Sequence, residues 1–237
     1  AESIRFTGEM VPIDYDAGAG KTAFTKRFPI GPIACITPFN FPIMVPMWMW
    51  PMAVACGNTF VLKPSEKDPI SAIRTTELAQ EAGFPDGVLN LVHGGPAVVD
   101  RLLAHDDVAA VSFVGSTRAG ASIYAKGAAH GKRVQCMCGA KNYSIIMPDA
   151  NRGAAVDGIF GSAFGNTGQR CLAGSVVICV GDSAEWFVPA LTEKTKGIKI
   201  GAGDQAGTSM GPMQDLESRD RVLEYIGIGE SEGASVL

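Results

Sequence analysis

The sequence predicts an α/β fold in which helices cover both faces of a mostly parallel β-sheet. Two observations support this prediction. Short apolar runs of strand length recur at intervals of roughly 20 to 30 residues after residue 30, and segments with helical periodicity lie between them. Strands that alternate with single helices are joined by right-handed crossovers, which place the strands parallel and side by side. Ligands of such sheets bind at the carboxyl ends of the strands.

The first sheet is predicted between residues 30 and 139. Its predicted strands are Ile30–Ile36, Thr59–Leu62, Val88–Val92, Ala109–Val114 and Arg133–Cys136. The helices predicted between them are Phe41–Cys56, Pro69–Ala82, Ala97–Ala104 and Arg118–Ala128. Because Pro42, Pro46 and Pro51 interrupt the first of these helices, we expect it to be buried and broken.

A second α/β unit is predicted after Lys141. Its predicted strands are Ser144–Met147 and Val176–Val180, and its predicted helices are Ala154–Phe164, Ala184–Lys196 and Arg219–Gly233. A further strand is predicted to begin at residues 234–237, so we expect the chain to be an incomplete stretch of a longer protein.

A leading segment of residues 1–10 precedes a predicted β-hairpin over residues 11–29. Its two strands, Val11–Tyr15 and Thr22–Phe28, flank a glycine-rich turn. An isolated hairpin is marginally stable in water, so we expect it to need a partner surface.

The composition restricts the class of protein. The 237 residues carry a net charge of −4, and the Lys and Arg residues are scattered, which argues against nucleic acid as a partner. The longest apolar run, Phe41–Cys56, is short for a membrane span and rich in proline. The N-terminus shows no secretory signal and the six cysteines have no zinc-site spacing, so we expect a cytoplasmic protein, or a matrix protein in a mitochondrion, without a metal.

Four short motifs carry the chemistry. They read Thr37-Pro38-Phe39-Asn40-Phe41-Pro42, Lys63-Pro64-Ser65-Glu66, Phe113-Val114-Gly115-Ser116-Thr117 and Gly168-Gln169-Arg170-Cys171. In this order and spacing they resemble the aldehyde dehydrogenase superfamily over essentially the whole chain. The resemblance implies a Rossmann-like dinucleotide-binding domain at residues 30–139 and part of a catalytic domain at 140–237. It also implies an oligomerisation arm at 11–29 and assembly as a dimer or tetramer.

Cys171 is the candidate nucleophile. A cysteine thiolate among small and polar residues can attack the carbonyl carbon of a small aldehyde substrate. The resemblance implies that the side-chain amide of Asn40 and the backbone N–H of Cys171 stabilise the oxyanion that this attack creates. Preorganised donors of this kind contribute about 3–4 kcal/mol each. Arg170 is a candidate for binding a substrate carboxylate, because its planar fork matches a carboxylate.

The resemblance also implies a dinucleotide site. Lys63 is expected to hydrogen-bond the adenosine ribose, and Glu66 to assist. A carboxylate at this place disfavours a 2′-phosphate, so NAD is expected rather than NADP. Ser116 is a predicted helix N-cap that faces the pyrophosphate at the positive end of the helix. The other candidate cofactor-binding residues are Ile36, Thr37, Pro38, Phe39 and Gly115.

The sequence departs from the hydrolytic members of the superfamily. Met137 stands where those enzymes carry the glutamate that activates water, and Met49 stands where many carry a lysine. A thioether cannot act as a general base. Four stretches resemble instead the coenzyme A-acylating methylmalonate-semialdehyde dehydrogenases: Pro46-Met47-Trp48-Met49, Gly57-Asn58-Thr59-Phe60, His130-Gly131-Lys132-Arg133-Val134-Gln135 and Gly139-Ala140-Lys141-Asn142.

The expected function is therefore NAD-dependent oxidation of a malonate- or methylmalonate-semialdehyde through a Cys171 thioester that passes to coenzyme A. Two alternatives stay open. One is a hydrolytic, NAD(P)-dependent aldehyde dehydrogenase that releases a carboxylic acid. The other is a nucleotide-binding fragment without turnover.

Overall fold

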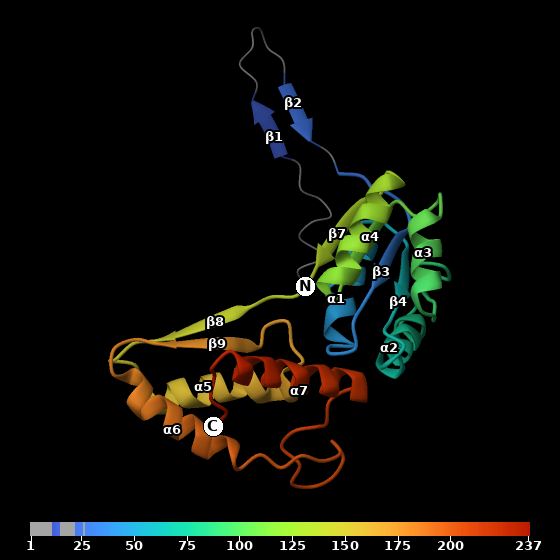
Figure 1. Cartoon of the computed structure of the whole chain (residues 1–237). Coiled ribbons are helices and arrows are strands. Elements are labelled where there is room, and N and C mark those ends of the chain that lie inside the picture. Colours follow the sequence, from blue (N-terminus) through green and yellow to red (C-terminus); the bar gives the residue numbers. More distant parts are fainter. Residues whose placement is uncertain (1–10, 15–21, 26) are drawn as a thin grey trace. The chain divides into compact units, whose positions relative to one another are not determined.

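The structure is a computed structural model that describes residues 11–14, 22–25 and 27–237. It divides into two compact units, Ala1–Gly139 and Ala140–Leu237. The boundary between the units lies close to Lys141, after which the sequence pattern changes. Figure 1 shows both units with their elements labelled. In the described part of the chain, no helix has the length and apolar character needed to cross a membrane.

The N-terminal strands β1 (Val11–Asp14) and β2 (Thr22–Thr25) pair antiparallel, with Val11 opposite Thr25 and Asp14 opposite Thr22. Residues 27 and 28, which the sequence predicts to continue the second strand, are described and lie outside it. The predicted turn at residues 16–20 lies outside the described residues, and a role as an oligomerisation arm stays a prediction.

The first unit contains a five-stranded, wholly parallel sheet in the order β5-β4-β3-β6-β7. Its strands are β3 (Ile33–Ile36), β4 (Phe60–Lys63), β5 (Leu89–Leu91), β6 (Ala110–Val114) and β7 (Arg133–Met137). The chain starts in the middle at β3, moves outward through β4 and β5, and returns to the other side of β3 with β6. This confirms the predicted α/β class with its parallel sheet.

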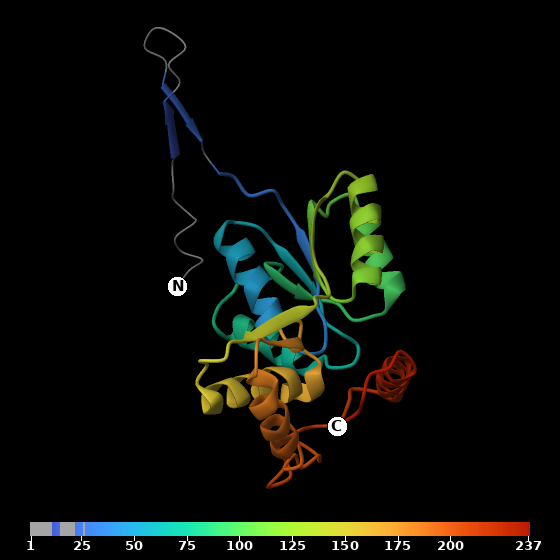
Figure 2. The same ribbon diagram turned by 60° about the vertical axis from the view of Figure 1, so that its left-hand side comes forward.

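Four helices cover the two faces of this sheet: α1 (Met44–Ala55), α2 (Ile70–Glu81), α3 (Pro96–Ala104) and α4 (Thr117–Ala129). Figure 2 shows α1 and α2 on one face and α3 and α4 on the other. Successive residues of β3 point to opposite faces, so Cys35 packs with α1 and α2 while Ala34 and Ile36 pack with α3 and α4. Burial on both faces is the physical reason for the continuous apolar runs in these strands.

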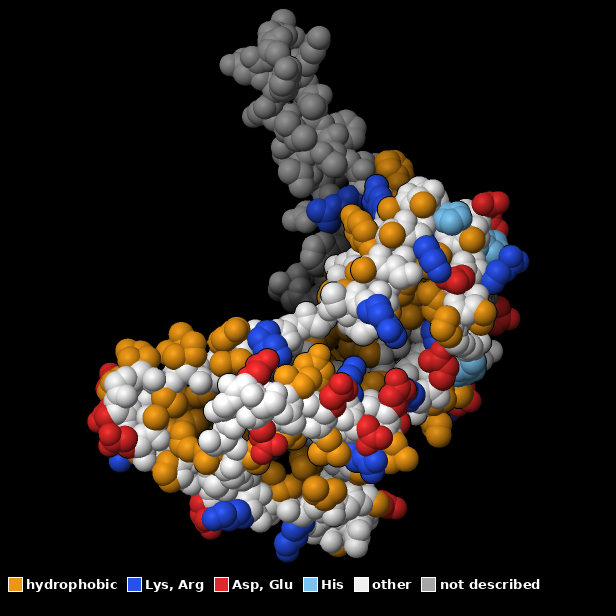
Figure 3. Space-filling view, viewed as in Figure 1, with side chains coloured by type: hydrophobic (Ala, Val, Ile, Leu, Met, Phe, Trp, Pro, Cys, Tyr) orange, Lys and Arg blue, Asp and Glu red, His pale blue; other side chains and the backbone are white. Residues whose placement is uncertain are grey.

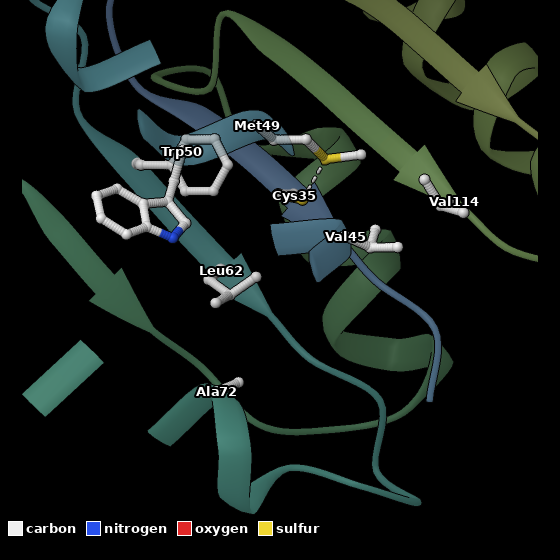
Figure 4. Packing of buried hydrophobic residues seen from close by; sticks show 8 residues of the cluster. Cys35, Val45, Met49, Trp50, Leu62, Ala72 and Val114 are labelled. Atoms are coloured by element: carbon white, nitrogen blue, oxygen red, sulfur yellow. Dashed lines mark hydrogen bonds between the residues drawn. The ribbon is translucent and has the colours of Figure 1, made fainter. Parts of the chain in front are cut away.

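Helix α1 corrects one prediction. It runs unbroken from Met44 to Ala55 although Pro46 and Pro51 lie inside it. Pro46 occupies the first turn, where the backbone N–H has no partner within the helix, so it costs no helical hydrogen bond there. Packing of Val45, Met49 and Trp50 against the sheet stabilises the rest of the helix (Figure 4).

The second unit is built on two parallel strands, β8 (Asn142–Ile146) and β9 (Gly174–Cys179). Its helices are α5 (Arg152–Phe164), α6 (Ser183–Thr195) and α7 (Leu216–Ser231). Ile146 packs against Val156, Ile159 and Phe187 in a small core between the strands and helices α5 and α6. Residues 234–237 form no strand, which corrects the prediction of one.

The other face of the β8–β9 pair is apolar and open. Tyr143, Ile145 and Ile178 lie on it and are 62%, 64% and 44% exposed. Figure 3 shows apolar side chains, coloured orange, gathered along the region of β8.

Candidate active site and cofactor pocket

A pocket of about 460 Å³ lies at the carboxyl ends of β3, β4 and β6. The strand order reverses between β3 and β6, so the pocket occupies the switch point at which parallel sheets of this kind bind ligands. All eight predicted cofactor-binding residues line it: Ile36, Thr37, Pro38, Phe39, Lys63, Glu66, Gly115 and Ser116. Three loops that are remote in sequence are thereby brought to one cavity.

Lys63 is the buried cation of this pocket. Its side chain is 3% exposed, and its ammonium group donates to the carbonyl oxygens of Pro64 at 2.7 Å and Gly94 at 2.8 Å. Glu66 Oε1 lies 3.2 Å from the same nitrogen. Two carbonyls and one carboxylate match the three donors of an ammonium group, which explains how this charge is tolerated away from water.

Gly94 is required for this arrangement. Its φ of +143° lies in a region that only glycine adopts readily, and an added Cβ would come within 2.4 Å of Val98. The loop after β5 can therefore turn the Gly94 carbonyl toward Lys63 only if this residue has no side chain.

The pocket also contains the N-terminus of α4. Ser116 is the N-cap, as predicted, and its hydroxyl accepts the backbone N–H of Ala119 at 3.3 Å. A Cβ on Gly115 would lie 2.4 Å from the ring of the buried Phe113, so a larger residue here would have to displace that ring. The free N–H groups and dipole at such a helix start favour an anionic ligand.

The side-chain hydroxyl of Thr37, a residue that lines the pocket, has no hydrogen-bond partner in the described part of the chain. Thr37 is 4% exposed, and this hydroxyl oxygen is buried. Such a group costs free energy unless a ligand or water satisfies it.

Residues along α3 and α4 that no sequence motif predicts also line this pocket. Pro96, Val99, Ser122 and the ion-paired Asp100 and Lys126 line it, with 2.7 Å between the charged atoms of the pair. No short motif marks these residues, because they meet only when α3 packs beside α4. The only sequence signal for these residues was the helical periodicity of the two segments that contain them.

Cys171 lies in the second unit, half-buried in a tight turn. The carbonyl of Arg170 accepts the N–H of Ala173 at 3.2 Å, which places Cys171 and Leu172 at the centre of the turn. The preceding residues Asn166 and Thr167 have φ values of 54° and 57°. A β-branched residue in this left-handed region is strained, and such strain is concentrated at functional sites.

Side-chain hydrogen bonds hold the strained segment. The Thr167 hydroxyl donates to the Gly211 carbonyl at 2.7 Å, and Gln169 Oε1 accepts the N–H of Gln214 at 3.2 Å. The segment before Cys171 is therefore tied to the loop that leads into α7.

The structure places Arg170 over the end of α5. One guanidinium nitrogen donates to the Gly161 carbonyl at 3.3 Å, and a Cβ on Gly165 would lie 2.5 Å from that nitrogen. A cation at a helix C-terminus interacts favourably with the helix dipole. Arg170 thus has a structural partner, and its role toward a substrate carboxylate stays a prediction.

Asn40 belongs to the first unit, in the loop after β3, and Cys171 belongs to the second. Their joint action on an oxyanion therefore stays a prediction. The two methionines noted in the sequence lie in the core of the first unit. Met49 is 8% exposed and its sulfur lies 2.8 Å from the Cys35 thiol, while Met137 packs against the same cluster.

A five-stranded parallel sheet with a pocket at its switch point defines a Rossmann-like fold. The chain belongs to the aldehyde dehydrogenase family, whose family model matches residues 1–237. Malonate-semialdehyde dehydrogenase 1 of Oceanobacillus iheyensis is 53% identical over 211 residues, which are 89% of this chain and 43% of that protein.

Two solved structures are similar over the whole length of the chain. The methylmalonate-semialdehyde dehydrogenase of Oceanimonas doudoroffii is 44% identical with a TM-score of 0.92, and the match covers 100% of this chain and 48% of that one. The second structure is a Sinorhizobium meliloti 1021 protein that is described as a methylmalonate-semialdehyde dehydrogenase and is complexed with NAD. It is 43% identical with a TM-score of 0.92, and the match covers 98% of this chain and 47% of that one. The chain spans about half the length of the relatives it matches.

Proposed function

We propose that this chain carries the dinucleotide pocket and the nucleophilic cysteine of an NAD-dependent malonate- or methylmalonate-semialdehyde dehydrogenase that acylates coenzyme A. The observation that carries the proposal is the convergence of eight residues from three separate motifs on one pocket. The names of the relatives support the substrate class.

The residues of the pocket fit a dinucleotide. The start of α4 at Ser116 suits the pyrophosphate, and the Lys63 ammonium beside the Glu66 carboxylate suits ribose hydroxyls, which both donate and accept. The buried hydroxyl of Thr37 would gain a partner from a bound polar group. When bound, NAD would supply the acceptor for the hydride that leaves the substrate.

The covalent chemistry belongs to Cys171. Its thiolate would add to the aldehyde carbon, so that a carbon–sulfur bond forms and the carbonyl π electrons move to oxygen. The Cys171 N–H and the Asn40 amide would stabilise this oxyanion. Loss of the carbon's hydride restores the carbonyl and leaves a thioester on Cys171. The thiolate of coenzyme A would then attack the thioester, and the Cys171 thiolate would leave.

Transfer to a thiol rather than to water is supported by Met49 and Met137. These residues occupy the two positions at which the family resemblance leads us to expect ionisable side chains, and both pack in the apolar core of the first unit. Neither can deprotonate water. A thiol needs less help, because its thiolate is already a strong nucleophile near neutral pH.

The test is release of NADH from malonate semialdehyde and from methylmalonate semialdehyde, each with and without coenzyme A. We expect sustained turnover only with coenzyme A, and acyl-coenzyme A as the product by mass spectrometry. Equal turnover without coenzyme A would identify a hydrolytic enzyme. NAD binding by calorimetry without any NADH release would identify a nucleotide-binding fragment.

A further inference from the structure

The backbone on the C-terminal side of Cys171 is held by side chains from two other elements. The first is Asn142, the first residue of β8, which is half-buried. Its side-chain nitrogen donates to the carbonyl of Cys171 at 2.8 Å and to the carbonyl of Ala173 at 2.9 Å. Because both partners are carbonyl oxygens, the group facing them must be the NH₂, and both of its hydrogens are used.

The second is Ser162, near the end of α5. Its hydroxyl accepts the N–H of Gly174 at 2.9 Å and lies 3.5 Å from the carbonyl of Leu172. Two short polar side chains thus bind consecutive backbone groups of the turn that carries the candidate nucleophile.

The strand pairing beneath the turn is irregular at the same place. Asn142 pairs with Gly174 but Tyr143 pairs with Val176, so Ser175 is an extra residue in β9. A bulge of this kind redirects side chains and is common next to active sites. Asn142 is the last regular partner before this irregularity, and its side chain reaches the carbonyls of Cys171 and Ala173.

These contacts bear on one particular peptide group. The peptide between Arg170 and Cys171 carries the N–H proposed as an oxyanion donor, and its carbonyl accepts the N–H of Ala173. The orientation of that N–H therefore depends on the position of Ala173, which Asn142 holds through the Ala173 carbonyl. Hydrogen-bonded chains of this type also strengthen each member.

We propose that Asn142 is a positioning residue for Cys171: its amide fixes the turn so that the Cys171 N–H points where the oxyanion forms. This inference rests on the proposed function. It predicts that Asn142 affects reactions of Cys171 that pass through an oxyanion and spares reactions that do not.

The test compares two reactions of Cys171 in the full chain without any cofactor. With p-nitrophenyl acetate, the Cys171 thiolate attacks the ester carbonyl, an oxyanion forms, and p-nitrophenolate leaves to give an acetyl thioester. With iodoacetamide, the thiolate displaces iodide from carbon and no oxyanion forms. Peptide mass spectrometry assigns both products to Cys171, and Cys171→Ser gives the background from other residues.

We expect Asn142→Ala to slow acetylation about tenfold or more while alkylation changes by less than about twofold. Asn151→Ala is the matched control, because Asn151 caps α5 through the N–H of Ala154 and does not touch the turn. It should lower thermal stability without changing the ratio of the two rates. If Asn142→Ala does not fold, Asn142→Ser keeps one donor and should give a smaller loss in the same ratio.

The folded Asn142 variant could show the same acetylation-to-alkylation ratio as the parent or as Asn151→Ala. That result would overturn the inference and leave the proposed function standing. A parent chain whose Cys171 is not acetylated above the Cys171→Ser background would contradict both.

Discussion

The ammonium of Lys63 lies 3.2 Å from the carboxylate of Glu66, although Lys63 is buried and the Glu66 side chain is 52% exposed. The lysine is also held by the Pro64 and Gly94 carbonyls, so Glu66 is the member of the pair that can move when a ligand arrives. The pair therefore joins a fixed cation to an adjustable anion in the pocket that we propose for the dinucleotide.

Glu66 should decide between the two dinucleotides. Its negative charge repels a 2′-phosphate, so Glu66→Gln is expected to lower the ratio of the NADP to the NAD dissociation constant about tenfold. Calorimetric titration with each dinucleotide measures this ratio. Glu77→Gln is the control, because Glu77 pairs with Arg74 on the exposed side of α2 and makes the same change in net charge. An identical shift in both variants would refute a specific role for Glu66.

Lys63→Met should weaken NAD binding at least about tenfold, because the donor beside the ribose is lost. It should also destabilise the first unit by about 1–3 kcal/mol, because the Gly94 and Pro64 carbonyls lose their partner. Lys132→Met is a matched control: Lys132 donates to the His105 and Val108 carbonyls and does not line the pocket. Equal loss of NAD affinity in both variants would mean that the effect is only one of stability.

Thr37→Val separates stability from binding. The Thr37 hydroxyl is buried without a partner in the described part of the chain, so its replacement by a methyl group should leave stability unchanged or raise it by about 1 kcal/mol. NAD affinity should fall, because the ligand loses a hydrogen-bonding group. Thermal unfolding with and without NAD measures both effects. Thr76→Val, which removes a hydroxyl bonded to the Ala72 carbonyl, should instead lower the melting temperature.

The decrease in folding stability at alkaline pH should depend on Cys35. Burial raises the pKa of the Cys35 thiol well above its ordinary value of 9.0. Above about pH 9 the unfolded chain loses this proton and the folded chain keeps it, so stability should fall by about 1.4 kcal/mol per pH unit from this residue. Below pH 9 both states are protonated and the effect is absent. Urea unfolding should show a shallower fall of stability with rising pH in Cys35→Ala than in the parent, and equal slopes in the two proteins would contradict this prediction.

Cys171→Ser should abolish NADH release and leave NAD affinity within about twofold of the parent. Cys171 is not among the residues that line the pocket in the described part of the chain, so the substitution removes the nucleophile and leaves the pocket lining unchanged. Cys179→Ser, at the end of β9, should retain turnover. Residual turnover by Cys171→Ser above the assay background would exclude Cys171 as the nucleophile.

Apolar runs predicted the strands of the first sheet, and the reason is clearest for β3, β4 and β6, which are buried on both faces. Sequence patterns were misleading at two places where the surrounding backbone decides the secondary structure. Residues 234–237 are apolar enough for a strand, but a strand forms only beside a neighbour. Pro46 reads as a helix breaker, yet it lies in the first turn, where its missing N–H is harmless.

By itself, the sequence determined the fold class and the family, and it predicted the motif residues that the structure brings to one pocket. Local motifs can be recognised in a sequence because each consists of neighbouring residues. Tertiary structure alone decided the strand order, the α3 and α4 wall of the pocket, the Gly94 carbonyl beneath Lys63 and the Asn142 amide beneath Cys171. Each of these features depends on groups that are remote in sequence and come into contact only when helices and strands pack. Such contacts leave no short pattern in the sequence.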